Sequence, residues 1–190
     1  MHCQPLLERD LDKAFAIGGA EEYNYTEYLE LYQKYADLYV GSYHAGKLVG
    51  VCYGWPFYQV RSDQPEMMLN IIAITPAYRR QGYGTQLIRY WEQQVAKRGH
   101  WLISLGSGAD MFYVKMDYFT IEYAIKVDKA LLNPNFRNMG YAISYVRYRE
   151  DPTLVLYVQA DEGKYEPELK QALMETFAAH DVVTIFGKYV

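Results

Sequence analysis

The segment ITPAYRRQGYGTQL, residues 74–87, holds the side chains and spacings best suited to chemistry in this chain. Two arginines, Arg79 and Arg80, precede two glycines, Gly82 and Gly84, and a helical pattern follows directly. The first four N–H groups of a helix lack intrahelical acceptors, and the helix dipole adds roughly half a positive charge there. Glycine has no Cβ atom, so an anion can approach the main chain closely. The segment therefore predicts a phosphate-binding loop in which backbone N–H groups are the main donors.

Two other glycine-containing motifs would indicate different classes of protein. A dinucleotide-binding fingerprint needs its first glycine directly after the strand and a third glycine where this chain has Leu87. The ATP-binding P-loop needs Gly-Lys-Ser/Thr, which does not occur in the sequence. Both are excluded. A basic turn without any ligand stays open, because glycine pairs of this kind are common.

The pattern of apolar residues predicts the elements around this loop. Residues 66–74, EMMLNIIAI, form a strand with apolar residues on both faces, as expected in the middle of a sheet. Residues 84–99 form an amphipathic helix that ends at Gly99, with one apolar stripe. That stripe consists of Leu87, Ile88, Trp91 and Val95. Further strands are predicted at 2–7, in a hairpin at 38–57 that turns at 44–47, and at 100–107, 119–127, 139–149, 153–160 and 182–190; further helices are predicted at 8–17, 24–39, 108–118 and 169–177.

Composition limits the class of protein. A chain of 190 residues, 51% of them apolar and 21 of them tyrosine, suits one globular domain, or one domain with an appendage. Its net charge of −4 gives no electrostatic reason to bind nucleic acid. Two cysteines and four scattered histidines lack metal-ligand spacing, so no metal is expected. The N-terminal residues are too acidic for a signal peptide and no apolar run is long enough to span a bilayer, so we expect a cytoplasmic protein without a membrane partner.

Two segments in the right order resemble a known family. The residues RRQGYG, 79–84, match the pattern Arg/Gln-x-x-Gly-x-Gly/Ala of the GNAT acyltransferase superfamily. The residues FYVKMDYF, 112–119, are similar to the aromatic-Tyr-x-Lys-x-Gly-Phe segment at the end of that family's fourth helix. The resemblance implies an α/β fold of the mixed α+β type, with a central mixed, mostly antiparallel twisted sheet flanked by helices. We expect residues 1–149 to form the acetyltransferase core and residues 150–190 a C-terminal β-α-β extension packed on the same domain.

The resemblance also implies a substrate and the residues that bind it. Acetyl-CoA would be the acyl donor, and an amide from a bulge in the strand 66–74 would face the thioester oxygen. The pyrophosphate would be bound by the main chain of the loop and by arginine charge, while the strand before the loop would pair with the pantetheine arm. These donor-binding residues are Ile72, Ala73, Ile74, Arg79, Arg80, Gln81, Gly82, Tyr83, Gly84 and Thr85.

Acetyl transfer to an amine sets its own requirements. A primary amine has a pKa of about 10.4, so it must lose a proton before it attacks, and the departing thiolate must be stabilised. By its position in the family's segment, Tyr113 is the expected acid and Glu66, before the central strand, a candidate base. Asn70 could orient a water molecule, and Asp110 and Glu122 are further candidate bases that the sequence does not rank. For Tyr113 and Glu66 alike, a purely structural role stays open.

The chain departs from the family pattern in ways that leave its function open. Asp117 stands where the family has glycine, and the asparagine often found ahead of the fourth helix is absent, with Ser107 or Asp110 as its substitute or with none. The extension could form a homodimer interface, cover the acceptor site or lengthen the sheet. The leading hypothesis is an acetyl-CoA-dependent N-acetyltransferase acting on a small-molecule or peptide amine. The alternatives are a non-catalytic acyl-CoA-binding module and an interaction protein that kept only the scaffold.

Overall fold

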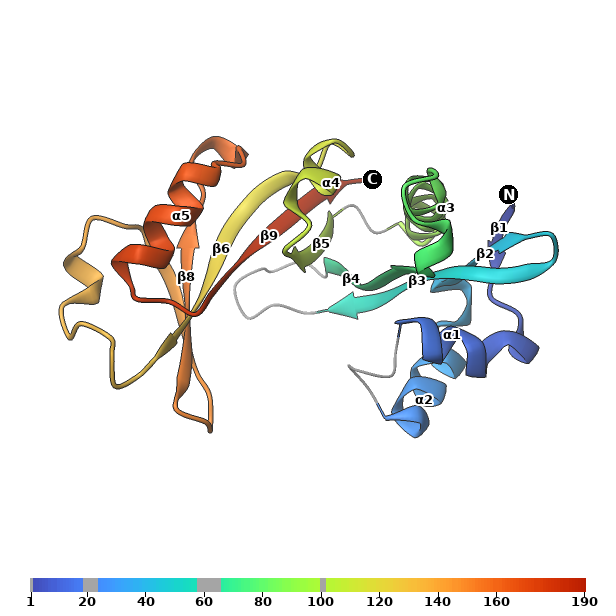
Figure 1. Cartoon of the computed structure of the whole chain (residues 1–190), viewed down its shortest axis with the longest axis horizontal. Coiled ribbons are helices and arrows are strands. Elements are labelled where there is room, and N and C mark those ends of the chain that lie inside the picture. Colours follow the sequence, from blue (N-terminus) through green and yellow to red (C-terminus); the bar gives the residue numbers. More distant parts are fainter. Residues whose placement is uncertain (1, 19–23, 58–65, 100–101) are drawn as a thin grey trace. The chain divides into compact units, whose positions relative to one another are not determined.

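The computed structural model describes residues 2–18, 24–57, 66–99 and 102–190 and divides the chain into two compact units. Unit 1 comprises Met1–Ile103 with Tyr189–Val190, and unit 2 comprises Ser104–Lys188. Each unit has its own strands and helices (Figure 1). No helix among the described residues combines the length and the hydrophobicity that crossing a bilayer requires.

Unit 1 is built on an antiparallel sheet. Its strands lie in the order β1 (His2–Pro5), β2 (Tyr39–His44), β3 (Lys47–Phe57) and β4 (Glu66–Ile74), each antiparallel to the next. The β2–β3 hairpin turns at Ala45 and Gly46, whose φ angles of 47° and 74° are those of a tight turn that follows the twist of the sheet. The predicted hairpin is confirmed.

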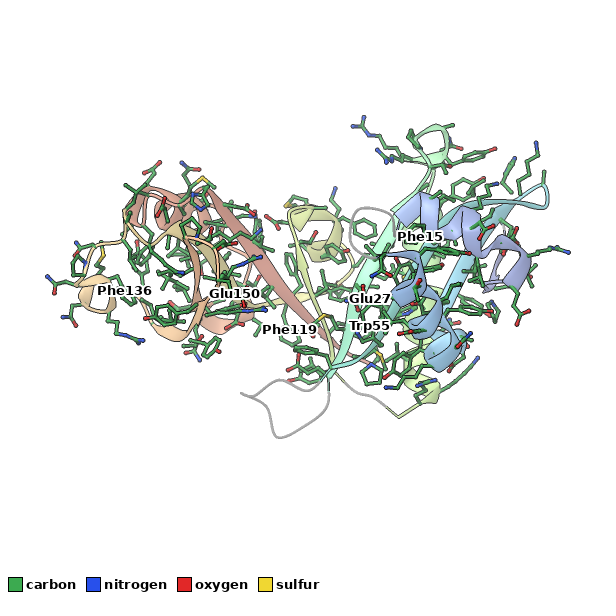
Figure 2. All side chains as sticks on the ribbon, turned by 90° about the horizontal axis from the view of Figure 1, so that it is seen from below. Phe15, Glu27, Trp55, Phe119, Phe136 and Glu150 are labelled. Carbon is green, nitrogen blue, oxygen red and sulfur yellow. The ribbon has the colours of Figure 1, made fainter. Side chains whose placement is uncertain are left out.

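Helices cover both faces of this sheet (Figure 1). On one face lie α1 (Leu11–Gly18) and α2 (Tyr25–Tyr35), over an aromatic core against which Phe15 and Trp55 pack (Figure 2). On the other lies α3 (Tyr83–Lys97). The predicted stripe of α3 is completely buried: Leu87, Ile88, Trp91 and Val95 each have 0% exposure. The indole N–H of Trp91 donates to the carbonyl of Leu38 at 3.0 Å and fixes the helix on the sheet.

A bulge interrupts β4 at its middle. Tyr53 of β3 pairs with Ile71 and Gly54 pairs with Leu69, so Asn70 is the extra residue on β4. A Cβ atom at Gly54 would stand 2.0 Å from the Met68 carbonyl oxygen, which explains the glycine opposite the bulge. Before the bulge β4 is largely buried, as the sequence predicts, whereas from Asn70 onward it is half-buried.

Unit 2 contains the remaining strands and two helices, except that Leu102 and Ile103 at the start of one strand and Tyr189 at the end of another belong to unit 1. Along the chain these are β5 (Leu102–Ser107), α4 (Asp110–Val114), β6 (Phe119–Asp128), β7 (Ile143–Tyr148), β8 (Thr153–Gln159), α5 (Pro167–Thr176) and β9 (Asp181–Tyr189). The strands lie in the order β5-β9-β6-β8-β7, so the last strand of the chain is inserted between β5 and β6. Of the predicted strand 100–107, His100 and Trp101 lie outside the described residues.

One face of the unit 2 sheet is covered by α5. Leu173 of this helix and Phe177 just after its end, both predicted as part of its apolar stripe, pack with Tyr123, Leu156 and Val182 of three strands. Phe136, in the connection before β7, packs against the same cluster (Figure 2). These contacts bury the helix stripe against the sheet and fix α5 in place.

The mixed α/β fold class is confirmed, with a mostly antiparallel open sheet flanked by helices. The division into a core of 1–149 and an extension of 150–190 stays a prediction. Within unit 2, the strands after residue 150 are hydrogen-bonded to strands before it, because β8 pairs with β6 and β7 and β9 pairs with β6.

We expect Gly54→Ala to destabilise the protein by at least about 2 kcal/mol, because the new methyl would overlap a backbone oxygen that cannot move independently. Urea unfolding monitored by tryptophan fluorescence measures this change. Gly108→Ala is the matched control, since a Cβ atom at Gly108 meets nothing within 4 Å. Equal stability of the two variants would contradict the close approach of β3 and β4 at the bulge.

Candidate active site

The backbone between β4 and α3 leaves a set of N–H groups without helical partners. Gly82, the residue before α3, is left-handed with φ 84° and ψ −3°, and the helix begins at Tyr83. The first bond into the helix runs from the Gln86 N–H to the Gly82 carbonyl at 3.1 Å, so the N–H groups of residues 83–85 precede the helical ladder. A Cβ atom at Gly82 would meet nothing within 4 Å, so the space beside these donors is open.

Side chains of the loop bond to backbone carbonyls of the loop and of the neighbouring strands. The Arg79 Nε–H donates to the Ile74 carbonyl at 2.9 Å, at the end of β4. The Gln81 amide donates to the Ala77 carbonyl at 3.0 Å, and the Thr75 hydroxyl donates to the Val49 carbonyl at 3.1 Å. Arg80 is exposed and left-handed, with φ 59°. The loop is thus fastened to the sheet by its polar side chains, while both guanidinium groups stay at the surface.

The Tyr83 side chain anchors the start of α3. It is buried, and its hydroxyl lies 2.7 Å from the His44 Nδ1 atom at the β2–β3 turn. The Tyr78 ring lies 5.6 Å from the Tyr83 ring and 5.3 Å from the His44 ring. The sequence predicted only a phosphate-binding role for the N–H group of Tyr83, and the anchoring role of its side chain was missed. An aromatic residue between two glycines was the available signal.

The other predicted residues of unit 1 lie along β4. Glu66 begins the strand opposite Phe57 and is 6% exposed, and the bulge at Asn70 follows. Ile72, Ala73 and Ile74, the predicted pantetheine-pairing residues, come after the bulge and are half-buried. The strand therefore presents a buried carboxylate, a bulge and a partly exposed apolar segment in succession, and the segment leads directly into the loop.

Tyr113 lies on α4, in unit 2. It is 5% exposed, with its ring stacked on that of Phe186 at 5.6 Å and the edge of Tyr118 at 5.5 Å. Ser107, the last residue of β5, accepts the Ala109 N–H at its hydroxyl oxygen at 2.9 Å, just before α4. Ser107 thus supplies a side-chain oxygen ahead of α4, one of the two substitutes that sequence analysis considered for the missing asparagine.

Asp117 adopts the backbone conformation for which glycine is suited. Its φ angle is 62°, in the turn that closes α4, where the Tyr118 N–H donates to the Tyr113 carbonyl at 3.1 Å. Aspartate enters the left-handed region more readily than most residues, so it can replace the glycine of the family segment. The departure noted in the sequence leaves the turn intact.

The two other candidate bases are buried in unit 2 with partners of their own. Asp110, at the start of α4, accepts hydrogen bonds at Oδ2 from the Tyr165 hydroxyl at 2.8 Å and the Lys170 ammonium at 2.5 Å. Burial and the nearby Asp110 carboxylate raise the pKa of Tyr165 to about 12. Glu122, on β6, accepts a hydrogen bond from the Ser144 hydroxyl at 3.1 Å.

The mostly antiparallel sheet, the bulged β4 and the helix that begins after the left-handed Gly82 are the features expected of the GNAT fold. A family model described as the acetyltransferase (GNAT) family matches residues 6–118, and the chain belongs to this family. No curated protein matches the sequence.

Solved structures of similar fold include N-acetyltransferases. Naa20 from Chaetomium thermophilum, in complex with a bisubstrate analogue, is 17% identical, with a TM-score of 0.57 over 88% of this chain and 93% of that chain. The NatC complex bound to Gag peptide and CoA is 11% identical, with a TM-score of 0.53 over 83% of this chain and 95% of that chain. Ard1 from Thermoplasma volcanium is 14% identical, with a TM-score of 0.50 over 84% of this chain and 95% of that chain.

We expect the stability of variants at position 117 to follow the order Gly, Asp, Ala, with a total spread of about 1 kcal/mol, because the left-handed conformation strains residues with a Cβ atom. Chemical denaturation of the wild type, Asp117→Gly and Asp117→Ala measures the order. An alanine variant as stable as the glycine variant would contradict the left-handed conformation of this turn.

Proposed function

We propose that this protein transfers the acetyl group of acetyl-CoA to a primary amine by direct attack in a ternary complex. The observation that carries the proposal is the left-handed Gly82 at the start of α3, where helix N–H groups without helical acceptors lie next to open space, in a chain of the GNAT family.

The loop suits the diphosphate of coenzyme A by charge and by donor geometry. Main-chain N–H groups from Gln81 to Thr85 would donate to phosphate oxygens, with the helix dipole adding favourable potential. Arg79 and Arg80 are exposed and supply positive charge beside the same N–H groups. The half-buried segment Ile72–Ile74 would take the pantetheine arm, whose amides can pair with strand backbone as a neighbouring strand would.

Peptide amino termini are the first acceptors to test. Two of the solved structures of similar fold are described with a bisubstrate analogue and with a peptide and CoA, so donor and acceptor can be held together on this kind of scaffold. Lysine side chains, polyamines and amino sugars offer the same reacting group. Direct transfer requires that the neutral amine and the thioester be bound at once.

In the reaction, the amine lone pair attacks the thioester carbon and the carbon–sulfur bond then breaks. The amine gives up a proton to a base, and the sulfur leaves as a thiolate. Full proton transfer from a phenol to this thiolate is uphill by about 2 kcal/mol, so a hydrogen bond from Tyr113 is the more favourable form of assistance. An N–H group at the β4 bulge would donate to the carbonyl oxygen as negative charge develops on it.

Glu66 is our candidate for the base. It is a buried carboxylate at the start of β4, in the same unit as the phosphate loop. Asp110 is the weaker candidate, because a lysine ammonium and a phenol already donate to one of its oxygens. Water could relay the proton between the amine and Glu66.

A non-catalytic acyl-CoA-binding module is the second candidate. The observation in its favour is the burial of Tyr113 against Phe186 and Tyr118, which a purely structural residue would also show. Both candidates predict coenzyme A binding, and only the enzyme predicts turnover.

Coenzyme A at 100 times its dissociation constant is expected to stabilise the wild type by about 2.7 kcal/mol, and Gly82→Glu is expected to abolish this effect. The new side chain would occupy the open space and add negative charge where the phosphates bind. Thermal unfolding with and without coenzyme A measures the stabilisation of each variant. Gly99→Glu, which alters a left-handed glycine just after the opposite end of α3, is the control and should keep the stabilisation. Unchanged stabilisation by coenzyme A in Gly82→Glu would contradict the proposed loop.

Tyr113→Phe is expected to lower kcat with a peptide amine by about 100-fold, because the phenol would no longer stabilise the thiolate. The ring packing is retained, so the melting temperature should change little. Thiol release from acetyl-CoA across a panel of amines measures the rate, with Tyr118→Phe as the control in the same segment. Full activity of Tyr113→Phe would contradict the role proposed for this side chain but would not contradict acetyl transfer itself. No thiol release by the wild type with any amine would favour the non-catalytic module.

A further inference from the structure

A buried cluster of polar side chains joins α4 to the C-terminal part of unit 2. Asp110 is 7% exposed, and its Oδ2 atom accepts hydrogen bonds from Lys170 at 2.5 Å and Tyr165 at 2.8 Å. Among the described residues no donor reaches its Oδ1 atom, which is buried as well. Because a buried carboxylate without partners is costly, this one depends on Lys170 and Tyr165.

The cluster lies beside Tyr113 on the same helix. Asp110 and Tyr113 are three residues apart in α4, so they share one helix face, and both are buried. The Phe186 ring of β9 is 5.6 Å from the Tyr113 ring and 6.2 Å from the Tyr165 ring. The residue that donates to Asp110 and the residue proposed to act on the thiolate therefore pack against the same aromatic ring.

Tyr165 is itself fixed by its neighbour. The Glu166 N–H donates to the Tyr123 hydroxyl at 3.0 Å, and the same hydroxyl lies 3.4 Å from the Glu166 carbonyl. Tyr123 is a fully buried residue of β6. The segment before α5 is thus attached to the centre of the sheet, and Lys170 follows within the first turns of that helix.

We propose that Lys170 and Tyr165 are positioning residues that act through Asp110 to hold α4 and so orient the Tyr113 phenol. The proposal rests on the proposed function, since it assigns the residues after 150 a part in the same reaction. A short helix of five residues has little stability of its own, so side-chain contacts must fix its orientation. Because displacement of a reacting group by about 1 Å can cost up to about 100-fold in rate, these contacts affect turnover directly.

The variants separate the charge, the hydroxyl and the packing. Lys170→Met removes the ammonium and keeps the stem, Lys170→Arg restores a cation, and Tyr165→Phe removes the hydroxyl while keeping the ring. Gln171→Met is the matched control, since it changes an exposed polar residue of the same helix. We expect Lys170→Met to lower kcat about tenfold with KM for acetyl-CoA within about twofold, and Lys170→Arg to recover all but about threefold.

Double variants test whether the effect passes through Tyr113. In the Tyr113→Phe background, Lys170→Met and Tyr165→Phe should each lower kcat by less than about twofold, because the group they orient has been removed. The same tenfold loss in both backgrounds would overturn the proposal, as would unchanged kcat in Lys170→Met. If Lys170→Met does not fold, Tyr165→Phe gives the same comparison with no change of charge.

Hydrogen exchange tests the attachment independently of activity. The Lys115, Met116 and Tyr118 N–H groups bond to carbonyls of α4, so their exchange reports on the opening of this helix. We expect about tenfold faster exchange in Lys170→Met than in Gln171→Met. Equal exchange would overturn the proposal even in an active enzyme. Faster exchange in a protein that acetylates nothing would support the attachment of α4 and reject the proposed function.

Discussion

The chain reversal between β4 and α3 is the constraint on which the proposed site depends. The backbone passes through a left-handed residue at Gly82 to begin α3, and the space in which a Cβ atom of Gly82 would lie is open. The Tyr83 side chain is buried, and its hydroxyl bonds to His44. The Arg79 side chain donates to the last carbonyl of β4, and the Gln81 side chain donates to a carbonyl within the loop. Because side chains hold the loop from within, its backbone donors stay available for a ligand.

The residues proposed for the reaction belong to both units of the chain. Unit 1 contains the loop and β4, which are proposed to bind the donor, and also Glu66, the proposed base. Unit 2 contains Tyr113 on a short helix packed against Phe186 of β9. Since β9 is inserted between β5 and β6, the end of the chain contributes an inner strand of this sheet. This topology explains how residues far along the sequence come to lie beside α4.

The sequence predicted the elements well and the long-range contacts poorly. The stripe of α3, the β2–β3 hairpin and the strand before the loop follow from local periodicity and turn chemistry, and all three are present. Periodicity cannot show which strands become neighbours, so the insertion of β9 was not foreseen. The Lys170–Asp110 contact was missed for a related reason. The two charged residues are 60 positions apart in the chain, which is beyond the reach of local sequence patterns.

Amide chemical shifts of the 15N-labelled protein test the central claim most directly, because they report on individual main-chain donors. Titration with coenzyme A is predicted to move the amide signals of Gly82, Tyr83, Gly84 and Thr85, while pantetheine, which lacks the diphosphate, should leave them in place and affect only β4. Shifts of equal size with both ligands, or none with coenzyme A at saturation, would contradict the account that these N–H groups bind the diphosphate.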